Sequence, residues 1–478
     1  MSSQNLKQQT KRGLYWKFAE QFSNYGVQFI IGIFMARLLS PSDFGITALP
    51  AVFMSIAGIF IGGGFGSALV RKPELKEEDL STVFLYSMGV GIICYMLLFI
   101  AAPWIADFYN TPVLKPIMRV TALGFIYGPI GTPQYVLLQR RLNFKTPAKI
   151  SVVVKILSGV IGVTMAFIGY GVWALVISGM FAGIVGQIIT MSIVRWYPKT
   201  GWSRESFKYL WGFGNKMMAS GMLDSIYNNI TPIIVGKFFS TADLGVYNRA
   251  RGYAAMPSQN IHGVVRDVSF PVLSKLQNDP EKMVSHYRKM INVSTFVIFP
   301  LMMLLAAVAR PLIITMITAK WEACILLLQL MCFSLMWYPV HGLNLNILMV
   351  SGRTDLFFRL EVIKKVWGLL IMCVFLPMGL VAFTAADIFS SIICVYINSW
   401  YTGKFYGFGF KEQMKDIAPT LLLGLFMFVC VLFTTYIVPN MLLQLAVGLP
   451  LGAIIYLGGA YLFHFPEIKE IKYLLNRK

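Results

Sequence analysis

Long apolar runs separated by short polar segments are the main pattern along this chain of 478 residues. A bilayer core about 30 Å thick is crossed by a helix of about 20 apolar residues. The runs that reach this length number fourteen and lie at 14–38, 44–70, 82–108, 114–138, 150–170, 172–194, 216–239, 244–270, 291–317, 323–350, 354–380, 381–406, 417–438 and 441–463. The pattern therefore predicts an all-α polytopic membrane protein with about fourteen transmembrane helices.

The basic residues of the polar segments indicate an orientation. Lysine and arginine gather before the first run, in alternate connections between runs, and in the tail that follows the last run. Cytoplasmic loops of membrane proteins carry this excess of positive charge. Because an even number of spans returns the chain to its starting side, we expect both termini in the cytoplasm and only short loops outside.

The composition excludes a water-soluble globular protein. Hydrophobic residues make up 57% of the chain and charged residues 13%, against about 45–50% and 25% in soluble domains. The net charge of +20 is assigned to cytoplasmic loops and not to nucleic acid, since no polar segment is long enough to form a nucleic-acid-binding domain. The six cysteines lie in or beside apolar runs without metal-ligand spacing, so we expect no metal or cofactor.

The second half of the chain repeats the first. Residues 37–45 (RLLSPSDFG) match residues 237–245 (KFFSTADLG) with identical Ser, Asp and Gly. Further matches follow in the same order at offsets of 207 to 210: Pro73 with Pro280, Pro103 with Pro311, Pro129 with Pro339, and Lys155 with Lys365. Six spans separate the copies, so both enter the membrane from the same side, as in transporters built from parallel repeats.

The repeat predicts a division into four parts. These are a six-helix lobe at 1–195, a cytoplasmic linker at 196–215, a second six-helix lobe at 216–406, and an extra pair of helices with a cytoplasmic tail at 407–478. In transporters of this kind the substrate path lies between the lobes, near the bilayer midplane. At the linker, residues 202–213 interleave basic and aromatic side chains, which fits a helix lying on the membrane surface and equally a plain connecting loop.

Polar side chains form a stripe on the first span of each lobe. Glu20, Asn24 and Gln28 are spaced by four residues and share one helix face, and Ser220, Asp224 and Asn228 are the equivalents at an offset of 200. Polar groups at membrane depth face a cavity or a partner helix. We favour a watery cleft lined by both stripes. Glu20 and Asp224 are candidates for coupling transport to H⁺ or Na⁺, and a drive by the membrane potential alone is the alternative. The alternative is that the stripes bind neighbouring helices together inside one lobe.

Several cationic side chains lie well inside the predicted spans, where a charge is costly. They are Arg119, Lys155, Arg249, Arg251 and Lys365. A lumen with excess positive charge attracts anions, and the planar guanidinium group binds two phosphate oxygens at once. These residues are therefore candidates for an anion-binding path through the membrane.

Three segments of the chain resemble signatures of bacterial polysaccharide-unit flippases, the Wzx-type members of the MOP exporter superfamily. They are residues 35–45 (MARLLSPSDFG), 243–251 (DLGVYNRAR) and 268–276 (VSFPVLSKL). The resemblance covers nearly the whole chain. It implies a MATE/MOP-like fold of two pseudo-symmetric six-helix lobes plus two further helices, and a transporter in place of an enzyme.

The resemblance also implies a substrate, an oligosaccharide on polyprenyl diphosphate. Alternating access would move it from the cytoplasmic to the periplasmic leaflet of the bacterial inner membrane, in contact with membrane lipids and polysaccharide assembly machinery, for O-antigen, capsule or exopolysaccharide biosynthesis. A cationic central cavity is implied as well, with Arg37 as a further lining residue. Two alternatives stay open: a cation-coupled drug antiporter, which would depend on carboxylates, and a membrane glycosyltransferase or polymerase, which would need larger outer loops.

Overall fold

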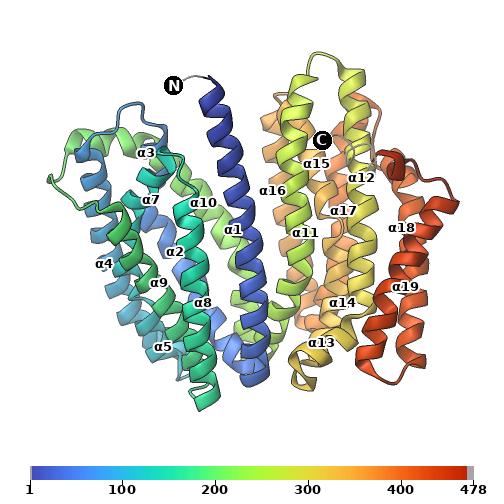
Figure 1. Ribbon diagram of the computed structural model, residues 1–478, viewed down its shortest axis with the longest axis horizontal. Coiled ribbons are helices and arrows are strands. Elements are labelled where there is room, and N and C mark those ends of the chain that lie inside the picture. Colours follow the sequence, from blue (N-terminus) through green and yellow to red (C-terminus); the bar gives the residue numbers. More distant parts are fainter. Residues whose placement is uncertain (1–2, 471–478) are drawn as a thin grey trace. The chain divides into compact units, whose positions relative to one another are not determined.

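The computed structural model describes residues 3–470, apart from the side chains of residues 3–15, 17–19 and 22, and these residues contain helices and no strand. The first helices are α1 (Ser3–Leu38), α2 (Pro41–Gly62), α3 (Phe65–Arg71), α4 (Glu77–Phe108), α5 (Leu114–Thr121), α6 (Gly124–Tyr127), α7 (Gly131–Arg140), α8 (Lys145–Ile168), α9 (Val172–Val194) and α10 (Arg204–Phe238) (Figure 1). They are followed by α11 (Thr241–Lys275), α12 (Pro280–Ala307), α13 (Ala309–Ile317), α14 (Ala323–Leu335), α15 (Tyr338–Val350), α16 (Thr354–Phe375), α17 (Leu380–Tyr406), α18 (Phe410–Ile437) and α19 (Met441–Leu462). Short 3-10 turns occupy η1 (Gly128–Ile130), η2 (Ala319–Trp321) and η3 (Leu376–Met378).

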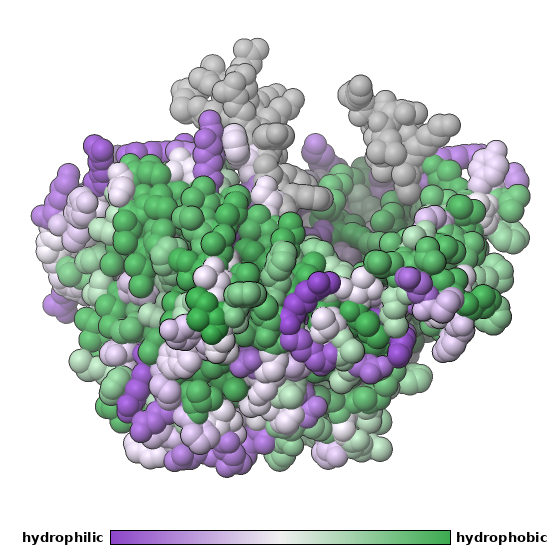
Figure 2. Space-filling view, turned by 60° about the horizontal axis from the view of Figure 1, so that its bottom comes forward, coloured by the Kyte–Doolittle hydropathy of each residue, from purple (hydrophilic) through white to green (hydrophobic). Residues whose placement is uncertain are grey.

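The surface of these helices is suited to lipid. Nine helical segments in residues 3–470 are long and apolar enough to cross a membrane. Large apolar side chains such as Phe167, Tyr436 and Tyr461 are more than 70% exposed, and Figure 2 shows hydrophobic residues over much of the visible face. Apolar surface of this extent indicates contact with a membrane. The all-helical, multi-pass fold class is confirmed, whereas the number of fourteen spans stays a prediction.

Contacts divide the chain into two compact units, Met1–Gly245 and Val246–Lys478. The first unit includes α10, because α10 packs on α2, α3 and α4. This contact pattern differs from the expected second lobe at 216–406, and the expected linker at 196–215 lacks regular structure only as far as residue 203. The division into two six-helix transport lobes therefore stays a prediction.

Residues 202–213 contribute to the core of the first unit. Leu210 is fully buried beside Phe65 of α3. The Phe207 and Trp211 rings each have their centroids 6.1 Å from that of Phe65. Residues 204–213 form the first turns of α10, so the expectation of a plain loop is wrong, whereas the placement of this helix on a membrane surface stays a prediction.

The repeated sequence motif forms the same local structure twice. The Ser40 backbone N–H and hydroxyl donate to Asp43 Oδ2 at 2.9 and 2.7 Å, and the Asp43 N–H donates back to Ser40 Oγ at 3.3 Å. Ser240 and Asp243 make the same three bonds at 3.1, 2.7 and 3.0 Å. A reciprocal cap of this kind satisfies backbone donors that the first helical turn leaves unpaired. The identical Ser and Asp of the repeat therefore start α2 and α11.

The identical glycines of the motif allow these two helix starts to touch. A Cβ at Gly45 would lie 1.7 Å from the Thr241 carbonyl oxygen, and a Cβ at Gly245 would lie 1.9 Å from the Pro41 carbonyl oxygen. The hydroxyls of Ser42 and Thr241 are 2.7 Å apart. The backbones approach so closely that no larger residue fits at either glycine without movement.

A buried amide network holds α18, the first of the two extra helices, to the rest of the second unit. Tyr287 of α12 donates its hydroxyl to Asn344 Oδ1 of α15 at 2.8 Å. Asn344 and Gln413 of α18 exchange two hydrogen bonds of 3.0 Å each. All three residues are fully buried. Because buried amides need all of their partners, this network fixes α18 against α12 and α15.

Candidate functional site

Lys155 of α8 lies against the polar stripe of α1. Its ammonium group donates to Gln28 Oε1 at 3.1 Å and approaches the Asn24 carbonyl oxygen at 3.5 Å. The Glu20 carboxylate interacts with the same ammonium group through charge. The structure therefore brings together four residues that sequence analysis proposed for two separate roles.

Asn24 also binds the two helices together. Its side-chain amide donates to Ser151 Oγ of α8 at 2.8 Å, and the Ser151 hydroxyl lies 3.0 Å from Asn24 Oδ1. Helix contact, the alternative interpretation of the stripe, thus applies to Asn24. Glu20 and Lys155 also line an open space, so the stripe is more than a helix contact.

That space is a polar cavity with an apolar groove beside it. The cavity has a volume of about 270 Å³ and is lined by Glu20, Gln21, Asn24, Tyr25 and Lys155. The groove, of about 430 Å³, follows the same two helices and is lined by Val27, Ile30, Ile31, Phe34, Ile156, Gly159, Val160, Val163 and Thr164. One helix pair therefore offers a cation and an apolar channel to a single amphipathic ligand.

The second polar stripe lies on an exposed face of α10. Ser220, Asp224 and Asn228 are all exposed. The neighbouring face of α10 contacts α2, where Asn229 donates to Ser55 Oγ at 3.1 Å. The stripe on α1 lies at the contact of α1 with α8. The stripe on α10, in contrast, lies beside the contact of α10 with α2 and is not part of it.

Two further cations of the first unit have other surroundings. The Arg119 guanidinium lies 4.1 Å from the centroid of the Phe99 ring on α4, and its Nε donates to the Phe99 carbonyl oxygen at 3.3 Å. Arg37 is exposed in the last turn of α1, where a positive charge interacts favourably with the helix dipole. These contacts explain both positions without a ligand, and neither residue lines the cavity at Lys155.

The cations of the second unit lie at separate places. Arg249 packs between the rings of Tyr253 and Trp321, at 5.6 and 5.3 Å from their centroids. Arg251 interacts with Tyr247 and with the Asp387 carboxylate through charge. Residues two apart point to different sides of a helix. Lys365 is half-buried on α16. A shared cationic cavity formed by these residues stays a prediction.

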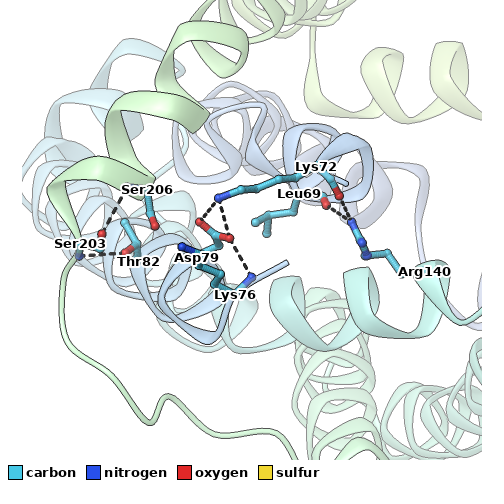
Figure 3. Close-up of polar contacts among 8 residues, drawn as sticks. All are labelled: Leu69, Lys72, Lys76, Asp79, Thr82, Arg140, Ser203 and Ser206. Carbon is cyan, nitrogen blue, oxygen red and sulfur yellow. Dashed lines mark hydrogen bonds and ion pairs between the residues drawn. The ribbon is translucent and has the colours of Figure 1, made fainter. Parts of the chain in front are cut away.

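The end of the first unit that contains α3 is held by charged groups. Figure 3 shows Arg140 of α7 reaching the carbonyl oxygens at the end of α3; it donates to Leu69 at 2.9 Å and also to Lys72. Lys72 donates to both oxygens of the fully buried Asp79, at 2.7 and 2.8 Å. Asp79 also accepts the Lys76 backbone N–H at 2.9 Å. These bonds fix α3 against α7 and against the start of α4.

Sequence analysis missed a larger pocket between α3, α7 and α9. It has a volume of about 680 Å³ and is lined by Gly66, Ser67, Val70, Arg71, Gly128, Gly131, Thr132, Tyr135, Val136, Gln139, Gln187 and Thr190. We call it the α3–α7–α9 pocket. The signal in the sequence is the helical spacing of its polar residues, three or four apart, on three separate short stretches.

The described residues hold no candidate metal centre. No group of three or more His, Cys, Asp or Glu within the described part of the chain is placed to hold a metal ion. The six cysteines are free thiols. The lining of the Lys155 cavity itself offers an ammonium group, a carboxylate and side-chain amides for binding by charge and hydrogen bonds.

Membrane-length helices and a cation in a polar cavity beside an apolar groove fit a membrane transporter. The chain belongs to the polysaccharide biosynthesis protein family, which matches residues 34–326. It is similar to the teichuronic acid biosynthesis protein TuaB of Bacillus subtilis (26% identity over 409 residues, 84% of each chain). It is also similar to the succinoglycan biosynthesis transport protein ExoT of Rhizobium meliloti (25% identity over 462 residues, 93% of this chain and 91% of the relative).

The fold is similar to that of a solved lipid flippase. The lipid II flippase MurJ, in an inward closed conformation, matches with a TM-score of 0.72 and 18% identity over 94% of this chain and 99% of that chain. At this identity the likeness shows the fold alone. The resemblance to polysaccharide-unit flippases and the assignment as a transporter are confirmed. The roles of individual side chains stay predictions.

Proposed function

We propose that this protein is a flippase for an oligosaccharide carried on polyprenyl diphosphate, which it moves from the cytoplasmic to the periplasmic leaflet of a bacterial inner membrane. Both termini then lie in the cytoplasm, and the saccharide passes to polysaccharide assembly machinery on the other side. The observation that carries the proposal is the ammonium group of Lys155 in a polar cavity next to an apolar groove on α1 and α8.

The physical problem of such transport is to carry a charged headgroup through hydrocarbon. An ion that leaves water loses its hydration energy, and a partner charge must offset that loss. The Lys155 ammonium supplies that charge for a diphosphate oxygen. The groove lined by Phe34, Ile156 and Val160 accepts part of the isoprenoid chain, and burial of each methylene contributes about 0.8 kcal/mol.

Glu20 allows the cavity to exchange a bound diphosphate against a proton or Na⁺. In the described structure its carboxylate acts on the Lys155 ammonium group. A diphosphate that binds Lys155 competes with that carboxylate, so Glu20 then takes up a proton or Na⁺ to stay neutralised. Substrate loading and ion loading are thereby linked at one lysine. The membrane potential adds to the drive, because export of two negative charges from an inside-negative cell is favourable by about 4–5 kcal/mol per 100 mV.

Reconstituted vesicles test the proposal. Lipid-linked saccharide is placed in one leaflet, and its appearance in the other leaflet is followed with a membrane-impermeant probe. Lys155→Ala should reduce the rate by about tenfold or more, since hydrogen bonds to charged groups contribute about 1.5–3 kcal/mol. Lys149→Ala, an exposed lysine of the same helix, is the matched control and should leave the rate unchanged.

Two results would contradict the proposal. Equal rates for Lys155→Ala and Lys149→Ala would remove the role of the Lys155 charge. Loss of activity in Glu20→Gln combined with full activity in Lys155→Ala would favour the alternative class, a cation-coupled antiporter that depends on a carboxylate.

A further inference from the structure

The α3–α7–α9 pocket holds unused hydrogen-bonding groups. On α7, Thr132, Tyr135 and Gln139 are three and four residues apart and therefore share one helix face. Among the described residues, the side chains of these three and of Ser67 on α3 find no hydrogen-bond partner, although all four line the pocket. Ser67 and Tyr135 are exposed, and Thr132 and Gln139 are half-buried, so a ligand in the pocket can reach all four side chains.

The facing helix α9 completes the polar lining. Gln187 and Thr190 are three residues apart and both line the pocket. The Gln187 amide reaches the Gly128 carbonyl oxygen only at 3.5 Å. A Cβ at Gly131 would lie 2.4 Å from Gln187 Oε1, so the glycine leaves the room that the amide occupies. Three helices thus present hydroxyl and amide groups to one space.

The chemistry of the lining fits sugar hydroxyl groups better than an anion. Hydroxyls and side-chain amides both donate and accept hydrogen bonds, as the hydroxyls of a sugar do. Among the lining residues Arg71 is the one permanent charge, and its guanidinium lies 5.2 Å from the centroid of the Phe213 ring. Tyr135, half-exposed at 51%, offers an aromatic face to the apolar C–H side of a sugar ring. The volume of about 680 Å³ lies in the usual range of small-ligand sites.

The walls of the pocket are rigidly held. Arg140 binds the backbone carbonyl groups at the end of α3, and Lys72 pairs with the buried Asp79 (Figure 3). The Arg140 bonds hold α7 against α3, and the Lys72–Asp79 pair holds the end of α3 against the start of α4. Binding groups on a rigid frame lose little freedom when a ligand binds.

We infer that the α3–α7–α9 pocket binds the saccharide part of the transported lipid, while Lys155 contacts its phosphate. The inference rests on the proposed function and adds a second, separate site to it. Hydroxyl and amide groups from three helices then distinguish the saccharide-bearing lipid from the bare polyprenyl carrier. Sugar selection and charge recognition are thereby assigned to different helices of one unit.

A binding comparison with two lipids tests the inference. The probes are the lipid-linked saccharide isolated from cells that lack this protein, and the same lipid after chemical removal of its sugars. Purified full-length protein in detergent should bind the first lipid more tightly. The double variant Thr132→Val/Gln187→Leu should lose about tenfold or more of its affinity for the saccharide-bearing lipid, because each hydrogen bond contributes about 1 kcal/mol. Its affinity for the bare carrier should not change.

Controls separate this inference from the proposed function. Ser192→Ala, on α9 but outside the pocket, should bind both lipids as the wild type does. Lys155→Ala should weaken both lipids alike. Tyr135→Ala, which alters a half-exposed side chain, gives a second pocket variant if the double variant fails to fold. Pocket variants that bind both lipids like the wild type would overturn the inference and leave the flippase proposal intact. Failure of the wild type to prefer the saccharide-bearing lipid would also overturn it.

Discussion

Replacement of Gly45 by alanine tests the close contact between the two helix starts of the repeated motif. The new Cβ would lie 1.7 Å from the Thr241 carbonyl oxygen and 3.1 Å from the Gly245 nitrogen. Both neighbours are backbone atoms, so no side chain can rotate away. Gly58 of the same helix α2 is the matched control, because nothing lies within 4 Å of a Cβ built there.

The expected cost follows from this geometry. Carbon and oxygen atoms approach to about 3.3–3.6 Å, so the helix starts would have to separate by roughly 1.5 Å. Overpacking of this kind lowers the free energy of unfolding by about 1–3 kcal/mol. The better helix propensity of alanine offsets up to about 1 kcal/mol of that loss. Gly45→Ala should therefore be less stable than the wild type, whereas Gly58→Ala should be equally or more stable.

Thermal unfolding of the purified protein in detergent measures the difference. The unfolding midpoint of Gly45→Ala should fall below that of the wild type, while the midpoint of Gly58→Ala stays level or rises. Gly245→Ala should resemble Gly45→Ala, because its Cβ would lie 1.9 Å from the Pro41 carbonyl oxygen. Equal midpoints for Gly45→Ala and Gly58→Ala would refute the reasoning.

Three further predictions concern other polar groups. Asp79→Asn should destabilise the first unit by about 3 kcal/mol, because it leaves Lys72 without its buried partner. Glu78→Gln, a change at the exposed neighbouring residue, should leave the stability unchanged. Similar unfolding midpoints for the two variants would contradict this prediction. Gln413→Leu should cost about 2–3 kcal/mol, since Asn344 loses two buried hydrogen bonds, and an unchanged midpoint would show that the network does not hold α18. Burial raises the pKa of the Glu467 carboxyl, which also lies near Glu470 and Asp416, so the wild type should lose stability as pH rises above the ordinary glutamate pKa. Glu467→Gln should remove that loss at pH 7–8 and behave like the wild type at low pH; a pH-independent difference between them would argue against it.

The repeat was predictable from the sequence, whereas its structural meaning was not. Identical Ser, Asp and Gly at an offset of 200 indicate equivalent positions. That Ser and Asp cap helices follows from their spacing and from local chemistry. The contact of Gly45 with the backbone at Thr241 joins residues far apart in the chain, and no local pattern specifies such a pair.

The candidate site was predictable in part for the same reason. The spacing of Glu20, Asn24 and Gln28 was sufficient to define a helix face, but not to identify α8 as its neighbour. Lys155 was recognised from the sequence as a cation inside a predicted span, but its partners Gln28 and Asn24 were not. The expectation that the α10 stripe lies opposite the α1 stripe across a cleft stays a prediction.

The cationic candidates show that a position deep in a predicted span does not by itself identify a ligand-binding cation. Arg119 lies well inside a predicted span, yet its guanidinium packs on the Phe99 ring. Arg249 similarly packs against Trp321. Aromatic faces stabilise cations without any ligand, and an aromatic partner on another helix is invisible in the sequence.

The α3–α7–α9 pocket escaped sequence analysis because its signal is short. The apolar run at 114–138 is divided into α5, α6, η1 and α7, so a polar face of three residues on α7 stands alone. Its partners on α3 and α9 come from distant parts of the chain. The pocket exists only because the fold places these three helices side by side.

The leaflet position of the lipid-linked saccharide in living cells tests the central claim most directly. A membrane-impermeant reagent added to the periplasm of cells depleted of this protein reports whether the saccharide is reachable from outside. The account predicts an unreachable saccharide, which becomes reachable when the wild type is restored and becomes reachable about tenfold or more slowly with Lys155→Ala. A saccharide that is fully reachable without the protein would contradict the account.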